Sequence, residues 1–97
     1  MKLKVGKLYV CEEYYLMLYP DKKSAAIAAE AGTAPVHARV AADIAYWTRK
    51  FGKPVLYAEL NMPLLILNVK EKYYEVLTGN KKGWIIFKDW LKIKELF

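Results

Sequence analysis

The sequence has very few of the residues from which catalytic and metal sites are usually built. Its 97 residues include one cysteine, Cys11, and one histidine, His37. One cysteine cannot form an internal disulfide, which fits a reducing cytoplasm. Together the two residues fall short of the four ligands that a structural zinc ion requires. Nucleotide-binding, hydrolase and metalloprotease motifs are also missing. We therefore expect no catalytic residue, no cofactor and no metal.

Long apolar runs are equally scarce. The longest, "YYLMLY" and "MPLLIL", are far shorter than the ~20 residues that cross a bilayer. The apolar part of the basic N-terminal stretch ends within a few positions, at Glu12 and Glu13, which argues against a secretory leader. These features predict a cytoplasmic protein without a membrane partner.

Arginine is rare although the chain is basic. Only Arg39 and Arg49 are arginines among the 16 basic residues, and arginine is the residue suited to bidentate recognition of phosphates and bases. The net charge of +6 therefore has two interpretations. It is either a solvated, solubilising surface or a lysine-built site for a polyanion.

Apolar and aromatic residues, by contrast, are plentiful. The chain is 56% apolar and has eight tyrosines and three tryptophans, a composition typical of folded proteins rich in strands and contact surfaces. Its length suits a single domain, residues 1–97.

Residues 21–53 form an alanine-rich region that predicts two helices. Asp21 or Ser24 can cap a first helix that ends at Gly32. A second helix begins with Pro35 in its first turn. Its apolar stripe follows helical spacing and consists of Val36, Val40, Ile44, Trp47 and Phe51. This stripe either packs on the rest of the chain or pairs with its copy in a symmetric dimer.

Strand-type segments lie on both sides of the helical region. Before it, we expect strands over about 7–12 and 14–19, with Glu12 and Glu13 at the break. Both faces of the second strand are apolar, which predicts that it is covered on both sides. After Pro54, the expected strands are "VLYAEL", "LLILNV", "YYEVL", "WIIF" and "LKIKEL". "TGNKKG" is predicted to be a hairpin loop, and "KDW" a single helical turn.

The order of these segments resembles a Src-homology-3-like barrel. "LYVCEEYY" is similar to its first strand, "AELNMPLLILNV" to its diverging turn and second strand, and "YYEVL" to its third strand. "TGNKKGWI" resembles its distal hairpin, and "KDWLKI" its helical turn and last strand. The resemblance implies a mainly β (α+β) fold. Its five-stranded antiparallel barrel would comprise residues 1–20 and 54–97, with a two-helix insertion at about 21–53.

Two positions depart from the peptide groove of that family. Tyr73 stands where its third strand begins with tryptophan, and Ile86 and Phe87 stand where proline precedes the helical turn. The resemblance therefore does not imply binding of proline-rich peptides. The chain, with its segments "GWII" and "DWLKI", also resembles small uncharacterised proteins of marine tailed bacteriophages. This resemblance implies a phage origin and a place in the host cytoplasm or the virion.

The stretch "LTGNKKGWIIFKDWLKI" contains the main candidate binding residues. Its tryptophans either fill the core and rim of a barrel or form part of an exposed aromatic surface. We expect a non-enzymatic protein-binding or assembly module, with a protein partner or self-association, whose candidate contact residues are Tyr73, Trp84, Trp90, Trp47 and Phe51. The alternative is a basic accessory protein that binds single-stranded nucleic acid. It would stack bases on Tyr73, Trp84 and Trp90 and hold a polyanion at Lys81, Lys82 and Lys88.

Overall fold

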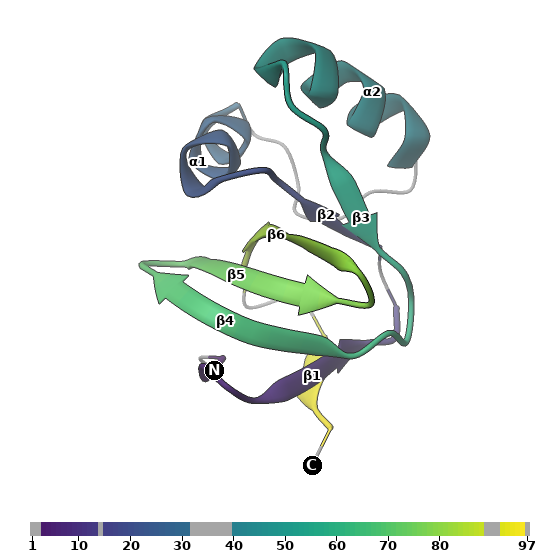
Figure 1. Ribbon diagram of the computed structural model, residues 1–97, viewed down its shortest axis with the longest axis vertical. Helices are drawn as coiled ribbons and strands as arrows, with labels where there is room; N and C mark the ends of the chain where they lie inside the picture. Colours follow the sequence, from purple (N-terminus) through teal and green to yellow (C-terminus); the bar gives the residue numbers. More distant parts are fainter. Residues whose placement is uncertain (1–2, 14, 32–39, 89–91, 97) are drawn as a thin grey trace.

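The computed structural model describes residues 3–13, 15–31, 40–88 and 92–96, with only the backbone for residues 40 and 41. Its elements are β1 (Leu8–Cys11), β2 (Leu16–Leu18), α1 (Lys22–Glu30), α2 (Val40–Phe51), β3 (Leu56–Ala58), β4 (Leu64–Lys70), β5 (Tyr73–Thr78), β6 (Lys81–Ile86) and β7 (Ile93–Glu95) (Figure 1). Every expected strand is present. The start of the second helix near Pro35 and the helical turn at "KDW" lie largely outside the described residues.

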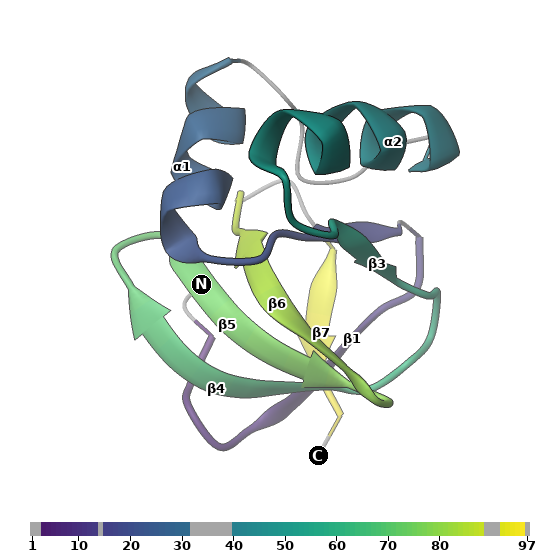
Figure 2. The same cartoon turned by 45° about the horizontal axis from the view of Figure 1, so that its top comes forward.

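Five strands form one antiparallel sheet in the order β6-β5-β4-β1-β7, and β2 pairs with β3 in a separate two-stranded ribbon. The hairpins β4-β5 and β5-β6 supply three of its five strands (Figure 2). β1 then brings the N-terminal segment between β4 and β7. The mainly β architecture with two helices agrees with the sequence-based expectation. In the described residues the five-stranded sheet does not close on itself, so the barrel implied by the resemblance stays a prediction.

The ribbon lies against the edge strand β6 at one point. The backbone N–H of Tyr19 donates to the carbonyl of Trp84 at 2.9 Å, and the N–H of Trp84 donates back at 2.8 Å. Gly83 makes this approach possible, because a Cβ at that position would lie 2.7 Å from the Cβ of Leu18. The ribbon is therefore joined to the sheet by a short bridge that depends on the absence of a side chain.

Two apolar clusters meet at the ribbon. We name them the sheet core (Leu3, Tyr9, Cys11, Leu16, Leu18, Ala58, Leu64, Ile66, Tyr74, Val76, Ile85 and Ile93) and the helix-side core (Met17, Tyr19, Ala25, Ala28, Trp47, Val55, Tyr73, Trp84 and Ile86). Side chains alternate between the faces of a strand, so Leu16 and Leu18 enter one core while Met17 enters the other. The prediction that this strand is covered on both sides is confirmed.

The helices cover the helix-side core (Figure 1). Asp21 precedes α1 as its N-cap, because its carboxylate accepts a hydrogen bond of 2.7 Å from the backbone N–H of Ser24. Ala25 and Ala28 are fully buried, and such small side chains let α1 lie close to β5 and β6. The prediction that Asp21 or Ser24 caps the first helix is thus resolved in favour of Asp21.

The described part of the α2 stripe packs inside the chain. Trp47 is 5% exposed and stacks on Phe51, with ring centroids 5.2 Å apart and planes 19° apart. Ile44 is partly buried against the same cluster. This packing supports the interpretation in which the stripe docks on its own domain. Val36 lies outside the described residues.

Candidate functional site

The aromatic residues proposed as contact residues are mostly buried. Tyr73 is 6% exposed, Trp84 is 8% exposed and Trp47 is 5% exposed, and all three belong to the helix-side core. Phe51 is partly buried against it, and Trp90 lies outside the described residues. The exposed stacking platform imagined for Tyr73 and Trp84 is therefore absent. Sequence spacing left open whether these rings are buried or exposed, because it could not show that the helices cover this face.

Tyr19 marks the polar centre of this buried cluster. Its side chain is fully buried, and its hydroxyl donates to the Sδ atom of Met17 at 3.6 Å. Burial raises the pKa of the Tyr19 hydroxyl well above its ordinary value, and the nearby charge of Asp43 raises it further. The hydroxyl therefore stays protonated at physiological pH and has no role as a base.

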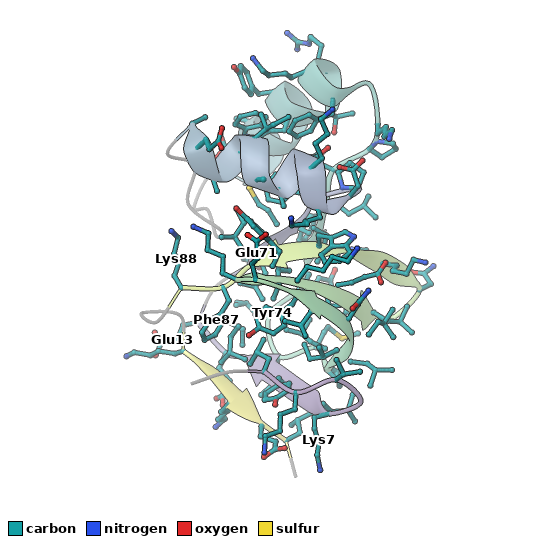
Figure 3. All side chains as sticks on the ribbon, turned by 90° about the vertical axis from the view of Figure 1, so that its left-hand side faces the viewer. Lys7, Glu13, Glu71, Tyr74, Phe87 and Lys88 are labelled. Carbon is teal, nitrogen blue, oxygen red and sulfur yellow. The ribbon has the colours of Figure 1, made fainter. Side chains whose placement is uncertain are left out.

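The three lysines proposed for a polyanion do not form one patch. Lys81 and Lys82 begin β6, whereas Lys88 follows the end of that strand and projects outward beyond Phe87 (Figure 3). A rise of about 3.3 Å per residue separates the two ends by roughly 20 Å. The side chains of Lys81 and Lys82 also point to opposite faces of the strand, because neighbouring side chains alternate. The expectation that the hairpin presents all three together is wrong, and the reason is that "TGNKKG" contains only a short turn at Gly79 and Asn80.

The acidic pair and the cysteine have structural surroundings. Glu13 forms an ion pair of 3.3 Å with Lys92, and Glu12 forms one with Lys94. The carboxylates thus tie the end of β1 to the last strand, and both line one cavity of about 400 Å³ beside it. Cys11 is 3% exposed and packs in the sheet core.

Exposed aromatic and apolar side chains lie on both faces of β3 and beside it. Tyr15 and Tyr57 meet edge to face, with ring centroids 5.7 Å apart. The Nζ atom of Lys81 lies 4.5 Å from the centroid of the Tyr57 ring and donates to the Tyr57 carbonyl at 3.2 Å. Exposed fractions are 39% for Tyr15 and 37% each for Leu56 and Met62. We call these five residues the β3 surface.

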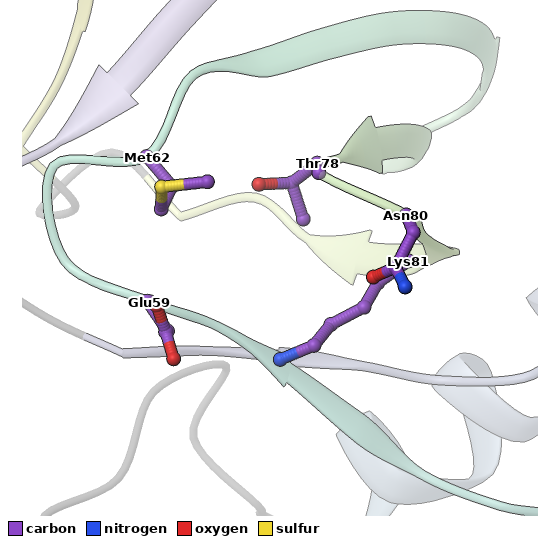
Figure 4. A pocket seen from close by; sticks show the side chains of 6 residues that line it. Glu59, Met62, Thr78, Asn80 and Lys81 are labelled. Carbon is purple, nitrogen blue, oxygen red and sulfur yellow. The ribbon is translucent and has the colours of Figure 1, made fainter.

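A pocket of about 220 Å³ borders the β3 surface (Figure 4). It lies between the β3-β4 connection and the β5-β6 turn, and its lining residues are Glu59, Met62, Thr78, Gly79, Asn80 and Lys81. Two left-handed residues shape the connections, Asn61 with φ 64° and Gly79 with φ 60°. Lys81 extends from β6 toward β3 and closes one side of the pocket (Figure 4).

Sequence reasoning identified Lys81 but missed the rest of this site. Tyr15 and Tyr57 looked like ordinary strand residues, and nothing in the local pattern states that their rings meet. The pairing of Met17 with Tyr57 across the ribbon brings them together. Only the turn signals in "NMP" and "TGN" could have indicated that two loops approach each other here.

Metal and membrane contacts find no support in the described ranges. Among these residues, no cluster of three or more His, Cys, Asp or Glu side chains is placed to hold a metal ion. No helix within the same ranges has the length and apolar character needed to span a bilayer.

No family model matches this chain, and neither the curated proteins nor the solved structures contain a match to it. The functional conclusion therefore rests on the geometry of its own residues.

Proposed function

We propose that this protein is a non-enzymatic protein-binding or assembly module that pairs an extended segment of its partner with β3. The observation that carries the proposal is the unpaired side of this strand. β3 is bonded to β2 on one side, and no strand of the described residues pairs with its other side. An exposed strand edge is a template for a further strand, and strand addition is a common mode of peptide recognition.

The side chains around this edge favour a protein partner. Three of the eight large apolar side chains that are exposed in the described residues, Tyr15, Leu56 and Met62, lie on or beside β3. Tyrosine anchors protein interfaces because it combines a large apolar ring with a hydroxyl that binds water or a partner. Packing Tyr15 against Tyr57 also restricts both rings before binding, which lowers the entropy cost of ordering them.

The fold and origin are further parts of the proposal. We place the sheet and ribbon in a Src-homology-3-like barrel. The strand order β6-β5-β4-β1-β7 supports this placement, as does the bridge between Tyr19 and Trp84, which brings the ribbon toward closing the sheet. The resemblance to small phage proteins supports a phage origin, and with it a location in the host cytoplasm or the virion.

The nucleic-acid alternative has less support from the geometry. Its aromatic platform is buried, and Lys88 is separated from Lys81 and Lys82 by the length of β6. The net charge of +6 remains as a source of weak, salt-dependent attraction to polyanions.

Site-specific photo-cross-linking tests the proposal. A benzoylphenylalanine replaces Leu56 in one variant and Val69 in a matched control, because these side chains have similar exposed fractions of 37% and 41% and Val69 lies on β4. We expect a discrete adduct in an extract of the source cells, with another protein or a second copy, from position 56 alone. Tyr57→Ser should reduce its yield. Equal adducts at both positions, or none at position 56, would contradict the proposal.

A further inference from the structure

We infer that the pocket beside the β3 surface binds a carboxylate side chain, Asp or Glu, of the segment that pairs with β3. The protein nature of the occupant rests on the proposed function. The preference for a carboxylate rests on the pocket itself and is tested without a partner.

Hydrogen-bond donors dominate the polar part of the pocket. Lys81 supplies an ammonium group, Thr78 a hydroxyl and Asn80 an amide. Thr78 is 4% exposed, so its orientation is fixed by the surrounding strands. Three donors from one short turn suit an acceptor with several lone pairs, and a carboxylate is the strongest such acceptor among protein side chains.

Lys81 is held in place by neutral groups. Its Nζ atom contacts the carbonyl and the ring of Tyr57, and among the described residues no ion pair involves it. The side chain is only partly exposed, which weakens the screening of its charge by water. A carboxylate that enters the pocket would add a charge-assisted hydrogen bond to a lysine that is already positioned.

The size of the pocket limits the ligand to one side chain. Its volume of about 220 Å³ lies below the roughly 300–1,000 Å³ of pockets that hold whole small molecules. The methyl end of Met62 lies near Gly79, where a Cβ would be 3.7 Å from it. This apolar wall suits the methylene groups of Asp or Glu.

Glu59 adds a negative charge to the pocket and weakens its attraction for anions. Its exposed carboxylate lines the same pocket and repels any anion that approaches Lys81. The attraction to Lys81 and the repulsion from Glu59 both grow with the charge of the ligand. The preference for a carboxylate therefore rests on the size of the pocket, which suits one side chain.

Acetate is the probe for a direct test. Acetate and its neutral analogue acetamide are titrated at constant ionic strength into the isotope-labelled protein, and amide chemical shifts are followed by NMR. We expect saturable shifts at residues 78–81 with acetate alone, with a dissociation constant on the order of 10 mM for so small a ligand. Lys81→Met should weaken binding about tenfold because the charged donor is lost. Glu59→Gln should strengthen it roughly two- to fourfold because the repulsion is lost.

A neighbouring lysine provides the control. Lys82→Met removes the same charge from the other side of the strand and should leave acetate binding nearly unchanged. The inference is overturned if acetate gives no local saturation, if acetamide binds equally well, or if Glu59→Gln weakens binding. If acetate binds but position 56 gives no cross-link, the carboxylate preference of the pocket is supported and strand pairing with β3 is refuted.

Discussion

A single methyl group added at Gly83 tests how the ribbon joins the sheet. In an unconstrained strand, alanine in place of glycine usually stabilises a protein by roughly 0.5–1 kcal/mol, because glycine loses more backbone freedom on folding. At position 83 the new Cβ would lie 2.7 Å from the Cβ of Leu18 and 3.0 Å from the carbonyl oxygen of Tyr19. Both atoms are fixed to the main chain, so no rotamer change can relieve the contact.

The predicted effect of Gly83→Ala therefore has the opposite sign. Overpacking of this kind costs about 1–3 kcal/mol. Moving the strands apart also weakens the two hydrogen bonds between Tyr19 and Trp84, each worth about 1 kcal/mol. After allowance for the entropic gain, we expect the free energy of unfolding to fall by about 2–4 kcal/mol. For a domain of this size the midpoint temperature should fall by roughly 10–25 °C.

Urea and thermal unfolding followed by circular dichroism measure this change, and amide exchange locates it. The Tyr19 and Trp84 amides should lose protection before the other bonded amides of β5 and β6. Gly52→Ala is the control, because a Cβ there meets no atom within 4 Å and only its φ of 69° is unfavourable. Its cost should stay near 1 kcal/mol. A Gly83→Ala protein as stable as the wild type would refute the close approach of β2 to β6.

Three further outcomes are expected. Trp47→Ala should lower the free energy of unfolding by about 3–5 kcal/mol in urea titrations, whereas Tyr46→Ala, at a side chain 53% exposed, should change it far less; equal effects would show that α2 does not dock through Trp47. Asp21 accepts the Ser24 backbone hydrogen bond, which holds its pKa below the ordinary value of 3.8; its contribution is therefore present above that pH and lost as the pH falls through the lowered pKa. Asp21→Asn, which keeps a capping side chain, should lose less free energy of unfolding between pH 5 and pH 2 than the wild type does. An equal loss in both proteins would contradict the role of Asp21 as a cap. Finally, single-stranded DNA should give no saturable anisotropy change at about 50 mM salt, where phosphate contacts are strong; binding abolished by Lys81→Glu with Lys82→Glu would restore the nucleic-acid hypothesis.

Local sequence patterns were sufficient for most elements of the fold. Alternation and turn residues located the strands, and the apolar character of both faces of residues 14–19 predicted β2 between two cores. Helix α1 followed from its capping residue. These features depend on neighbours within a few positions, where spacing and backbone preference decide the outcome.

Exposure of side chains could not be predicted in the same way. For Trp84 the sequence left open a place in the core or rim or an exposed aromatic face shared with Tyr73, and in the structure both residues are buried in the helix-side core. Tyr15 and Tyr57 were not singled out, yet their rings meet at 5.7 Å. Both results depend on contacts between segments distant in the sequence, and a period of two residues states only that a side chain lies on one face, not what covers that face.

The insertion starts and ends at neighbouring points of the chain, because Leu18 at the end of β2 is paired with Leu56 at the start of β3. A segment that leaves and returns across one strand pair can change its length during evolution without moving the sheet. The helices nevertheless cover Met17, Tyr19 and Trp84. A relative that has lost the helices should therefore carry small or polar residues at these three positions, so that the length of the insertion and the polarity of the sheet face beneath it would vary together among descendants of this chain.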